Sequence, residues 1–319
     1  MYIGIDVGGT NLVAGLVDHD YHIVAKAKRK TRTEGVNSAE DLCNEIVEVA
    51  CEAAQAGGAA LDEIELVGIG IPGAIDRPRG IVLHTPNAPF DNTPIRDIFQ
   101  RQWDVPVYLG NDANCAVVGE YLAGAARGYR SAMVITLGTG VGAGVIVDGK
   151  LFTGCNDTGL EAGHTVIQVD GRLCNCGRRG CWERYSSATG LKQTTREVME
   201  RNPDSLMWKL AGGTLEGVGG RTAFQAAREG DAAGRQVVDE YIRYLGIGVT
   251  NMVNIFQPEI ICLGGGVSNE SDDLFLEPLR AQVKAQRFTR VGTQTMIVKA
   301  ELGNDAGIIG AAMPFLDRQ

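Results

Sequence analysis

Residues 161–183 read EAGHTVIQVDGRLCNCGRRGCWE and supply one histidine and three cysteines within eighteen positions. Four nitrogen and sulfur ligands are what a closed tetrahedral zinc site needs. Gly177 and Gly180 allow the tight turns that bring the last cysteine back to the same ion. Disulfides, or four unconnected residues, are the alternatives, but closely spaced cysteines with glycine turns and a histidine favour zinc. The predicted Zn²⁺ ligands are His164, Cys174, Cys176 and Cys181.

Two carboxylates, Glu161 and Glu183, bracket this predicted zinc knuckle (residues 164–181). A structural metal would fix the direction of both side chains. A rigid pair of acceptors suits a ligand rich in hydroxyl groups. Taken alone, each glutamate is better explained as a solvated surface acid.

Composition indicates a globular protein of about two domains. The 319 residues are 44% hydrophobic, which is ample for two ordinary cores. A net charge of −9 argues against duplex nucleic acid or an anionic membrane as the main partner. The only basic run, between residues 26 and 32, alternates with small residues, so we expect a solvated edge strand there.

No secretory signal or spanning helix is evident, so we expect a cytoplasmic location. Asp6 lies within the apolar opening and no basic residue precedes Lys26, unlike a secretory signal. The longest uncharged run, residues 132–147, contains four glycines and predicts strand, turn and strand. In a reducing compartment the five cysteines outside the knuckle are expected to be thiols, mostly buried ones.

Three glycine-rich turns follow short apolar strands and are candidate nucleotide sites. The first joins a strand at 2–6 to a returning strand at 12–18, and its backbone N–H groups could face phosphate oxygens. Asp6 at its mouth is a candidate Mg²⁺ ligand, through water. A Gly-Gly turn is also common in ordinary hairpins. The candidate residues are Asp6, Gly8, Gly9, Thr10, Asn11, Gly138, Thr139, Gly140, Gly264, Gly265 and Gly266.

The second turn repeats the first in the other half of the chain. Residues 132–137, 138–140 and 141–147 again read strand, turn and strand, which is a weak internal repeat. Two such lobes would place their turns on opposite walls of one cleft. The third turn, at 264–266, could hold an adenosine, although a simple strand-to-helix connection is the alternative.

Loops after buried strands supply further candidates. Pro72-Gly73 forms a tight bend where a ligand could touch the backbone, and Asn87 lies in the polar loop beyond it. Turn chemistry explains Asn87 equally well. Asn111 and Asp112 open a helix after another strand, and on local evidence Asp112 is an N-cap.

Helical patterns account for much of the remaining chain. A helix is expected from Ser38, with Ser38 and Asp41 as a capping box, to a stop at Gly57-Gly58. Further helices are expected at about 94–103, 191–228 with breaks at Pro203 and 212–220, 232–256, 272–286 and 306–313, and a last strand at 295–298.

Together these residues resemble the ROK family of sugar kinases, nearly end to end, and within it the bacterial glucokinase branch. Two stretches are similar to the family's phosphate motifs, one to its ExGH motif and one to its zinc motif. They are Asp6-x-Gly8-Gly9-Thr10-Asn11, Leu137-Gly138-Thr139-Gly140, Glu161-x-Gly163-His164 and Cys174-x-Cys176-Gly-x-x-Gly-Cys181.

The resemblance implies an α/β, actin-like ATPase (RNase H-like) fold, with two lobes of related topology around a cleft. The small lobe would span residues 1–113, with a C-terminal helix at about 299–319 packing back on it. The large lobe, 114–298, would carry the zinc knuckle.

The resemblance also implies phosphorylation of the 6-hydroxyl of glucose by ATP, with Asp112 as general base. Mg²⁺ would accompany ATP, and Zn²⁺ would be structural. The implied sugar-contacting residues are Gly73, Asn87, Asn111, Asp112, Glu161, His164 and Glu183.

Other functions remain open at this point. Another hexose, such as N-acetylmannosamine, N-acetylglucosamine, fructose, mannose or allose, could be the substrate, because one pocket residue can decide whether a bulky 2-substituent fits. The family also includes sugar-responsive repressors, but only five residues precede Asp6 in this sequence, so we do not expect their DNA-binding domain here. Polyphosphate stays open as the donor, and the resemblance suggests a homodimer or homotetramer.

Overall fold

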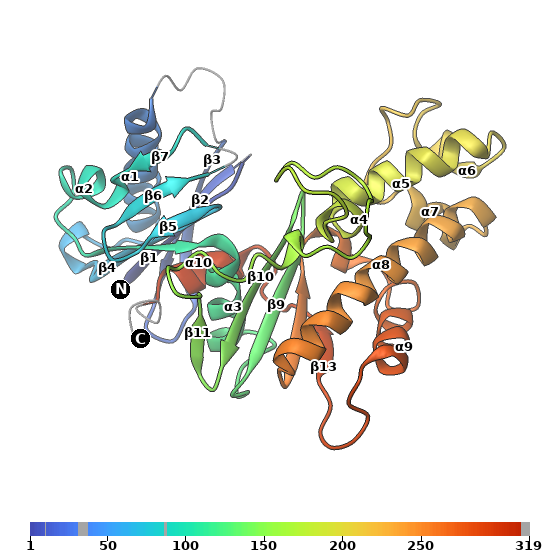
Figure 1. The fold of residues 1–319 in the computed structure, drawn as a ribbon. Helices are drawn as coiled ribbons and strands as arrows, with labels where there is room; N and C mark the ends of the chain where they lie inside the picture. Colours follow the sequence, from blue (N-terminus) through green and yellow to red (C-terminus); the bar gives the residue numbers. More distant parts are fainter. Residues whose placement is uncertain (10, 31–37, 86–87, 314–319) are drawn as a thin grey trace. The chain divides into compact units, whose positions relative to one another are not determined.

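The structure is a computed structural model that describes residues 1–9, 11–30, 38–85 and 88–313 (Figure 1). The chain divides into two units, which are described separately. The first contains residues 1–134, 144–160 and those from 300 onward, and the second contains residues 135–143 and 161–299. The expected lobes, 1–113 and 114–298, follow from a resemblance, and their boundaries stay a prediction.

A five-stranded sheet organises the first unit. Its strands are β1 (Tyr2–Val7), β2 (Asn11–Val17), β3 (Ile23–Lys30), β4 (Leu66–Ile71) and β8 (Val107–Asn111), in the order β3-β2-β1-β4-β8. β1 pairs with β2, and β2 with β3, in antiparallel register, whereas β1, β4 and β8 run parallel. The register aligns Asp6 with Gly70 and Ile71 with Asn111. The carboxyl ends of three parallel strands therefore meet at one edge of the sheet.

Residues 26–30 of the basic run lie on β3, which is an edge strand as expected, and Arg32 lies outside the described residues. Alternate side chains along β3 are exposed. Arg29 pairs with Glu48 and Glu52, and Lys26 pairs with Asp305 at 2.6 Å. These ion pairs hold two of the basic side chains within the first unit.

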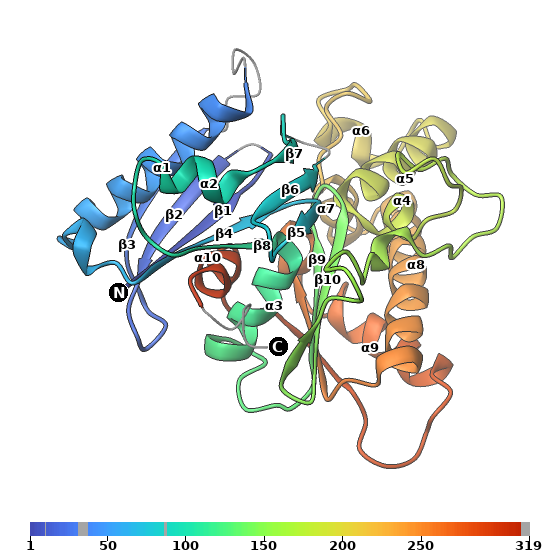
Figure 2. The ribbon, with the colours of Figure 1, turned by 60° about the vertical axis from the view of Figure 1, so that its left-hand side comes forward.

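Helices cover both faces of this sheet (Figure 2). They are α1 (Ala39–Ala56), α2 (Ile95–Gln100), α3 (Asp112–Ala123) and α10 (Asp305–Ala311), with a short 3₁₀ turn, η1 (Leu61–Glu63). The Ser38 side chain accepts from Asp41 N, as the predicted N-cap requires, and α1 ends at Gly57. α1 lies on one face, and α3 and α10 lie on the other. Coverage on both faces explains why every residue of β4 is buried.

A small three-stranded sheet occupies a region that the sequence predicted to be a polar loop. Its strands are β5 (Ala74–Asp76), β6 (Ile81–His84) and β7 (Asp91–Thr93), in the order β5-β6-β7. The prediction was wrong here because these strands are too short to show a hydrophobic period. Arg96 stabilises the region by donating to the carbonyl oxygens of Arg77, Pro78 and Val107.

A second five-stranded sheet has the order β11-β10-β9-β12-β13. Its strands are β9 (Ala132–Leu137), β10 (Val141–Val147), β11 (Lys150–Phe152), β12 (Ile260–Gly264) and β13 (Met296–Lys299). The predicted strand, turn and strand at residues 132–147 is present as β9 and β10. β12 and β13 run parallel, and β10 and β11 antiparallel.

The remaining helices belong to the second unit. They are α4 (Glu183–Ser186), α5 (Ala188–Arg201), α6 (Leu206–Leu210), α7 (Thr222–Arg228), α8 (Ala232–Phe256) and α9 (Leu276–Gln286), with 3₁₀ turns η2 (Ala162–His164) and η3 (Gly266–Asn269). α8 has the predicted bounds, whereas α9 starts later than expected, after a turn at residues 271–275.

Gly248, in the middle of α8, allows close packing of this helix. Trp182 is fully buried, and a Cβ added to Gly248 would overlap its indole ring. The absence of a side chain at Gly248 therefore lets α4 and α8 approach closely. Within the described residues, no helix is both long and apolar enough to cross a membrane.

Candidate functional site

The four predicted metal ligands lie together. One ligand atom from each of His164, Cys174, Cys176 and Cys181 lies within 4.8 Å of the others. Cys174 Sγ is 3.6 Å from His164 Nδ1, and Cys176 Sγ is 3.6 Å from Cys181 Sγ. A tetrahedral zinc site with ordinary bond lengths has edges of about 3.5 to 3.8 Å. These side chains therefore fit a zinc ion, and the sulfur separation excludes a disulfide between Cys176 and Cys181.

Tight backbone turns bring the ligands together. Gly177 and Gly180 have φ of 85° and 80°, the left-handed region that glycine adopts without strain. A Cβ at Gly180 would also overlap the carbonyl oxygen of Gln168. Cys174 N donates to Arg178 O at 2.8 Å, which closes the loop that carries the cysteines. The tight turns predicted at both glycines are confirmed.

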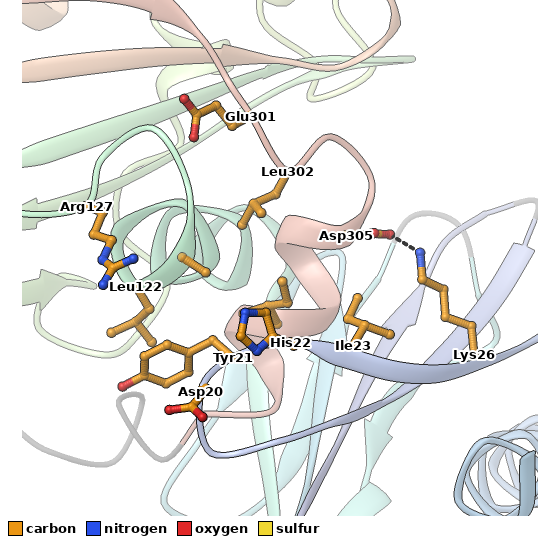
Figure 3. A pocket seen from close by; sticks show the side chains of 12 residues that line it. Asp20, Tyr21, His22, Ile23, Lys26, Leu122, Arg127, Glu301, Leu302 and Asp305 are labelled. Carbon is orange, nitrogen blue, oxygen red and sulfur yellow. Dashed lines mark hydrogen bonds and ion pairs between the residues drawn. The ribbon is translucent and has the colours of Figure 1, made fainter. Parts of the chain in front are cut away.

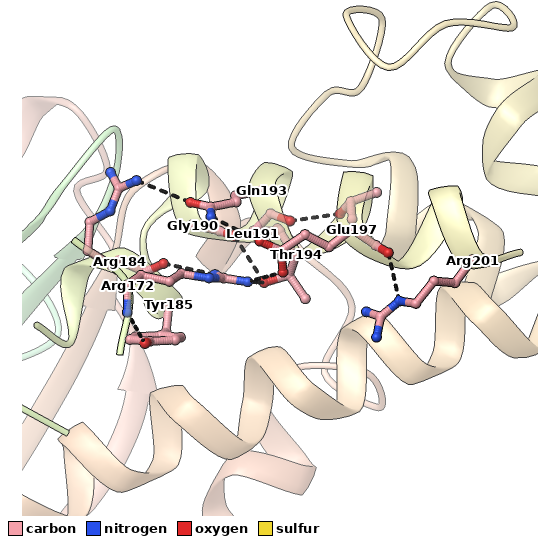
Figure 4. A network of polar contacts seen from close by, with 10 residues as sticks. Arg172, Arg184, Tyr185, Gly190, Leu191, Gln193, Thr194, Glu197 and Arg201 are labelled. Carbon is pink, nitrogen blue, oxygen red and sulfur yellow. Dashed lines mark hydrogen bonds and ion pairs between the residues drawn. The ribbon is translucent and has the colours of Figure 1, made fainter. Parts of the chain in front are cut away.

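An arginine inside the knuckle ties it to the helices that follow, and the sequence did not reveal this contact (Figure 4). Arg172 donates to Arg184 O at 3.0 Å, to Thr194 Oγ1 at 3.0 Å and to Glu197 Oε2 at 2.6 Å. Its guanidinium also lies over the ring of Tyr185, 4.9 Å from the centroid. The knuckle, α4 and α5 are therefore joined by a half-buried cation with several partners.

The candidate sugar acids lie on the two segments that carry the knuckle. Glu161 immediately precedes the 3₁₀ turn η2, and His164 N donates to Glu161 O at 3.0 Å. Trp182 N donates to Thr165 O at 2.8 Å, which joins the segment of Glu161 to that of Glu183. Glu183 Oε2 also accepts from Val141 N at 3.1 Å. The knuckle thus sets the backbone on which both carboxylates are carried.

In the first unit, Asn111 and Asp112 stand where β8 becomes α3. Asn111, not Asp112, is the N-cap, because its side chain accepts from Ala113 N and Asn114 N. Asp112 is the first residue of the helix, so the N-cap prediction for it was wrong. The side-chain oxygen of Asn111 accepts these hydrogen bonds, and its side-chain nitrogen donates to Gly73 O at 3.3 Å. Its side chain thereby joins the bend at Gly73 to the helix start.

Asp6 and Asp112 form an interacting pair of carboxyl groups. Burial raises the pKa of Asp6 to about 6, and the charge of Asp112 adds to that rise. Burial likewise raises the pKa of Asp112. Two carboxylates that are costly to ionise are typical of a site that binds a cation or moves a proton.

The glycine-rich turns are closed by backbone contacts. Gly8 N donates to Asn11 O at 2.9 Å, and Gly138 N donates to Gly140 O at 3.1 Å. Gly265 has a φ of 91°, and a Cβ there would lie 2.5 Å from Leu137 O. The third turn therefore packs on the strand that leads into the second. Thr10 and Asn87, two candidate residues, lie outside the described residues.

Comparison with known proteins decides the family. The model of the ROK family matches residues 2–318. This chain belongs to the ROK family. A glucokinase from Thermotoga maritima is 40% identical over 318 residues, covering 99% of this chain and 97% of the relative. A xylose repressor from Caldicellulosiruptor bescii is 33% identical over 246 residues, which are 76% of this chain but 60% of the repressor.

A solved ROK structure extends the match to the fold. The crystal structure of a ROK family glucokinase from Streptomyces griseus, in complex with glucose and AMPPNP, has a TM-score of 0.81 and 34% identity. The match covers 98% of this chain and 97% of that chain. The protein therefore has the expected actin-like ATPase fold of the ROK kinases, with mixed α/β sheets.

A cavity of about 780 Å³ in this ROK protein is lined by none of the predicted site residues (Figure 3). It is lined by the β2–β3 connection, the end of α3 and the start of α10, including His22, Arg127 and Glu301. The Lys26–Asp305 ion pair, at 2.6 Å, lies at its margin. Its charges are mixed, and we assign no ligand to it.

Proposed function

We propose that this protein is a glucokinase that transfers the γ-phosphoryl group of ATP to the 6-hydroxyl of glucose. The similarity to glucokinases over nearly the full chain carries the proposal. The carboxyl groups of Asp6 and Asp112, carried by neighbouring parts of one sheet and both costly to ionise, support it, because phosphoryl transfer needs a cation near the phosphates and a group that accepts one proton.

Asp112 is the proposed general base. The transferring phosphoryl group is loosely bonded in the transition state, so the protein mainly aligns the reactants and removes the proton of the attacking hydroxyl. A buried carboxyl group with a raised pKa holds that proton better than an exposed one. Asn111 caps α3 and so sets where Asp112 begins the helix.

The nucleotide phosphates are proposed to bind the glycine-rich turns. The backbone N–H groups of residues 8–11 and 138–140 would face phosphate oxygens, and the turn at 264–266 would lie against the adenosine. Asp6 would hold Mg²⁺ through water, which fits a buried carboxylate that needs a compensating positive charge. The bound ion would neutralise charge on the phosphates.

The sugar hydroxyls are proposed to bind near the knuckle. His164 Nδ1 faces Cys174, which leaves Nε2 for a sugar hydroxyl. In this proposal zinc is structural and fixes the angle of the imidazole ring. The proposed sugar-contacting residues are Gly73, Asn87, Asn111, Asp112, Glu161, His164 and Glu183.

The first experiment compares ADP release by the purified protein over a panel of hexoses. We expect glucose to give the highest kcat/KM. A higher value for N-acetylmannosamine, N-acetylglucosamine, fructose, mannose or allose would replace glucose as the substrate. Running the panel with polyphosphate in place of ATP tests the donor.

A cytoplasmic location and a homodimer or homotetramer complete the proposal.

The second experiment tests the base. Asp112→Asn should lower kcat by about 10²- to 10⁴-fold, because the amide cannot accept the proton. Glucose affinity, measured by calorimetry, should stay within a few-fold of wild type, because the amide keeps the shape of the side chain. Retained turnover in this variant would exclude Asp112 as the base.

A further inference from the structure

The second glycine-rich turn, residues 138–140, is held by the corner where α4 meets α5. We call residues 183–189 the α4–α5 corner. Two carbonyl groups of the turn and the N–H group that follows it all bind to this corner. Ala188 N donates to Gly138 O at 2.8 Å, Thr189 Oγ1 donates to Thr139 O at 2.9 Å, and Val141 N donates to Glu183 Oε2 at 3.1 Å.

These contacts orient the turn. In a trans peptide the C=O and N–H groups point in opposite directions. The carbonyl groups of Gly138 and Thr139 point to the corner, so the N–H groups of Thr139 and Gly140 point away from it. Successive N–H groups that point to one side form a site for an anion.

Close packing supports the same arrangement. A Cβ at Gly140 would overlap Glu183 Oε2, so glycine leaves room for the carboxylate in its present position. A Cβ at Gly163 would likewise overlap the carbonyl oxygen of Val141. Glu183 and the ExGH segment, 161–164, both therefore contact the residue that follows the turn.

The corner is a firm support. The Ser187 side chain accepts from Gly190 N at 3.0 Å, and Tyr241 donates from its hydroxyl to Ser186 O at 2.8 Å. Arg172 binds Arg184 O in the same corner (Figure 4). By contrast, Thr139 at the tip of the turn is exposed. The corner therefore supports the turn in addition to the turn's own hydrogen bond from Gly138 N to Gly140 O.

We propose that Thr189 is a positioning residue for the nucleotide. Its hydroxyl binds the carbonyl of Thr139 and so directs the N–H of Gly140 toward a phosphate oxygen, without touching the nucleotide itself. This inference rests on the proposed function, in which the turn binds phosphate. It also means that the carboxylate proposed to bind sugar and the backbone proposed to bind phosphate share one support.

Thr189→Val tests the proposal, because valine keeps the shape and removes the hydroxyl. Thr189 is exposed, so the variant should fold normally. We expect its Kd for Mg²⁺–AMPPNP, measured by calorimetry, to rise about three- to tenfold, the loss of one hydrogen bond. Its Kd for glucose should not change. Thr189→Ser should restore nucleotide affinity to within about twofold of wild type.

Thr195→Val is a control on the same helix, because the buried Thr195 hydroxyl donates to Leu191 O within α5, at 2.8 Å, and not to the turn. It should leave both affinities unchanged. Wild-type nucleotide affinity in Thr189→Val, or failure of serine to restore it, would overturn the inference. Equal loss of nucleotide and glucose affinity would also overturn it, as general damage. If the wild-type protein itself binds no nucleotide, the proposed function fails first.

Discussion

Asp6 and Asp112 acquire their properties from positions that are far apart in the sequence. Asp6 is the next-to-last residue of β1 and Asp112 follows β8, and β4 lies between the two strands in the sheet. Burial raises the pKa of both carboxyl groups, and the charge of Asp112 raises that of Asp6 further, to about 6. The sequence indicated both residues as candidates, Asp6 from the glycine-rich turn beside it and Asp112 from its place at the start of a helix. It could not predict their interaction, because β1 and β8 come together only in the folded sheet.

The pKa of Asp6 gives a stability prediction with a definite sign. The pKa rises from 3.8 in the unfolded chain to about 6 in the folded protein. The protonated carboxyl group of Asp6 therefore favours the folded state. Its contribution to the free energy of unfolding is complete below about pH 4 and is lost as the pH rises through 6. Without Mg²⁺, Asp6→Asn should stabilise the protein by roughly 2 to 3 kcal/mol at pH 8, and most of the gain should disappear between pH 6 and pH 4.

Urea unfolding at several pH values measures this effect. Asp18→Asn is the opposite control, because backbone hydrogen bonding from His22 lowers the pKa of Asp18. A carboxyl group whose pKa is lowered on folding stabilises the protein at pH values above its unfolded pKa. This stabilisation is lost as the pH falls. Asp18→Asn should therefore be destabilising at pH 8 and neutral in acid. A gain in stability from Asp6→Asn that does not change with pH would contradict the raised pKa of Asp6.

At the scale of the element, the knuckle shows what local spacing can specify. His164, Cys174, Cys176 and Cys181 are close in sequence, and glycines at 177 and 180 supply the turns. A ligand set of this kind needs few long-range contacts, so its pattern could be recognised directly. The Arg172 contacts to α4 and α5 have no comparable pattern, because Thr194 and Glu197 lie on a separate helix.

Removing one ligand tests the proposed zinc. Cys176→Ser should lose zinc, measured by atomic emission, lower the Tm and raise the KM for glucose several-fold, because the imidazole and both glutamates lose their common support. A chelator should produce the same changes in the wild-type protein. Cys155→Ser is the control, since Cys155 is an exposed thiol outside the cluster. Full metal content and unchanged sugar affinity in Cys176→Ser would exclude this site.

For the molecule as a whole, the decisive contact is the return of the chain's last described helix to its first strand. α10 packs on β1, β4 and α3. A Cβ at Gly4, Gly68 or Gly310 would overlap backbone of a neighbouring element. The sequence contains 43 glycines, and pattern alone does not separate these three from turn glycines.

Two glycines of α10 give a matched test of this packing. A Cβ at Gly310 would overlap the carbonyl oxygen of Cys115, whereas a Cβ at Gly307 would lie 3.7 Å from Asp6 Cγ, an ordinary contact. Gly310→Ala should destabilise the protein by about 3 kcal/mol. Gly307→Ala should be neutral or stabilise it by up to about 1 kcal/mol, because alanine favours helix. Equal Tm values in calorimetry would show that α10 does not pack closely at Gly310.

The sequence by itself determined the elements whose signals are local. Ser38 caps α1 as predicted, α8 has the predicted bounds, and the four predicted metal ligands lie together. Short strands such as β5 and β7 escaped prediction because three residues cannot show a period. The sequence does not distinguish Asn111 from Asp112 as the N-cap, because both have a suitable side chain, and only the extended backbone of Asn111 identifies it.

Tertiary structure alone decided the contacts between distant segments. The binding of Val141 N to Glu183, of Thr189 to Thr139 O and of Arg172 to Glu197 joins residues 25 to 50 positions apart. Such contacts depend on how helices pack on strands, and packing is set by shape and burial summed over many residues. Spacing in the sequence records which groups are available for chemistry, whereas folding decides which of them meet.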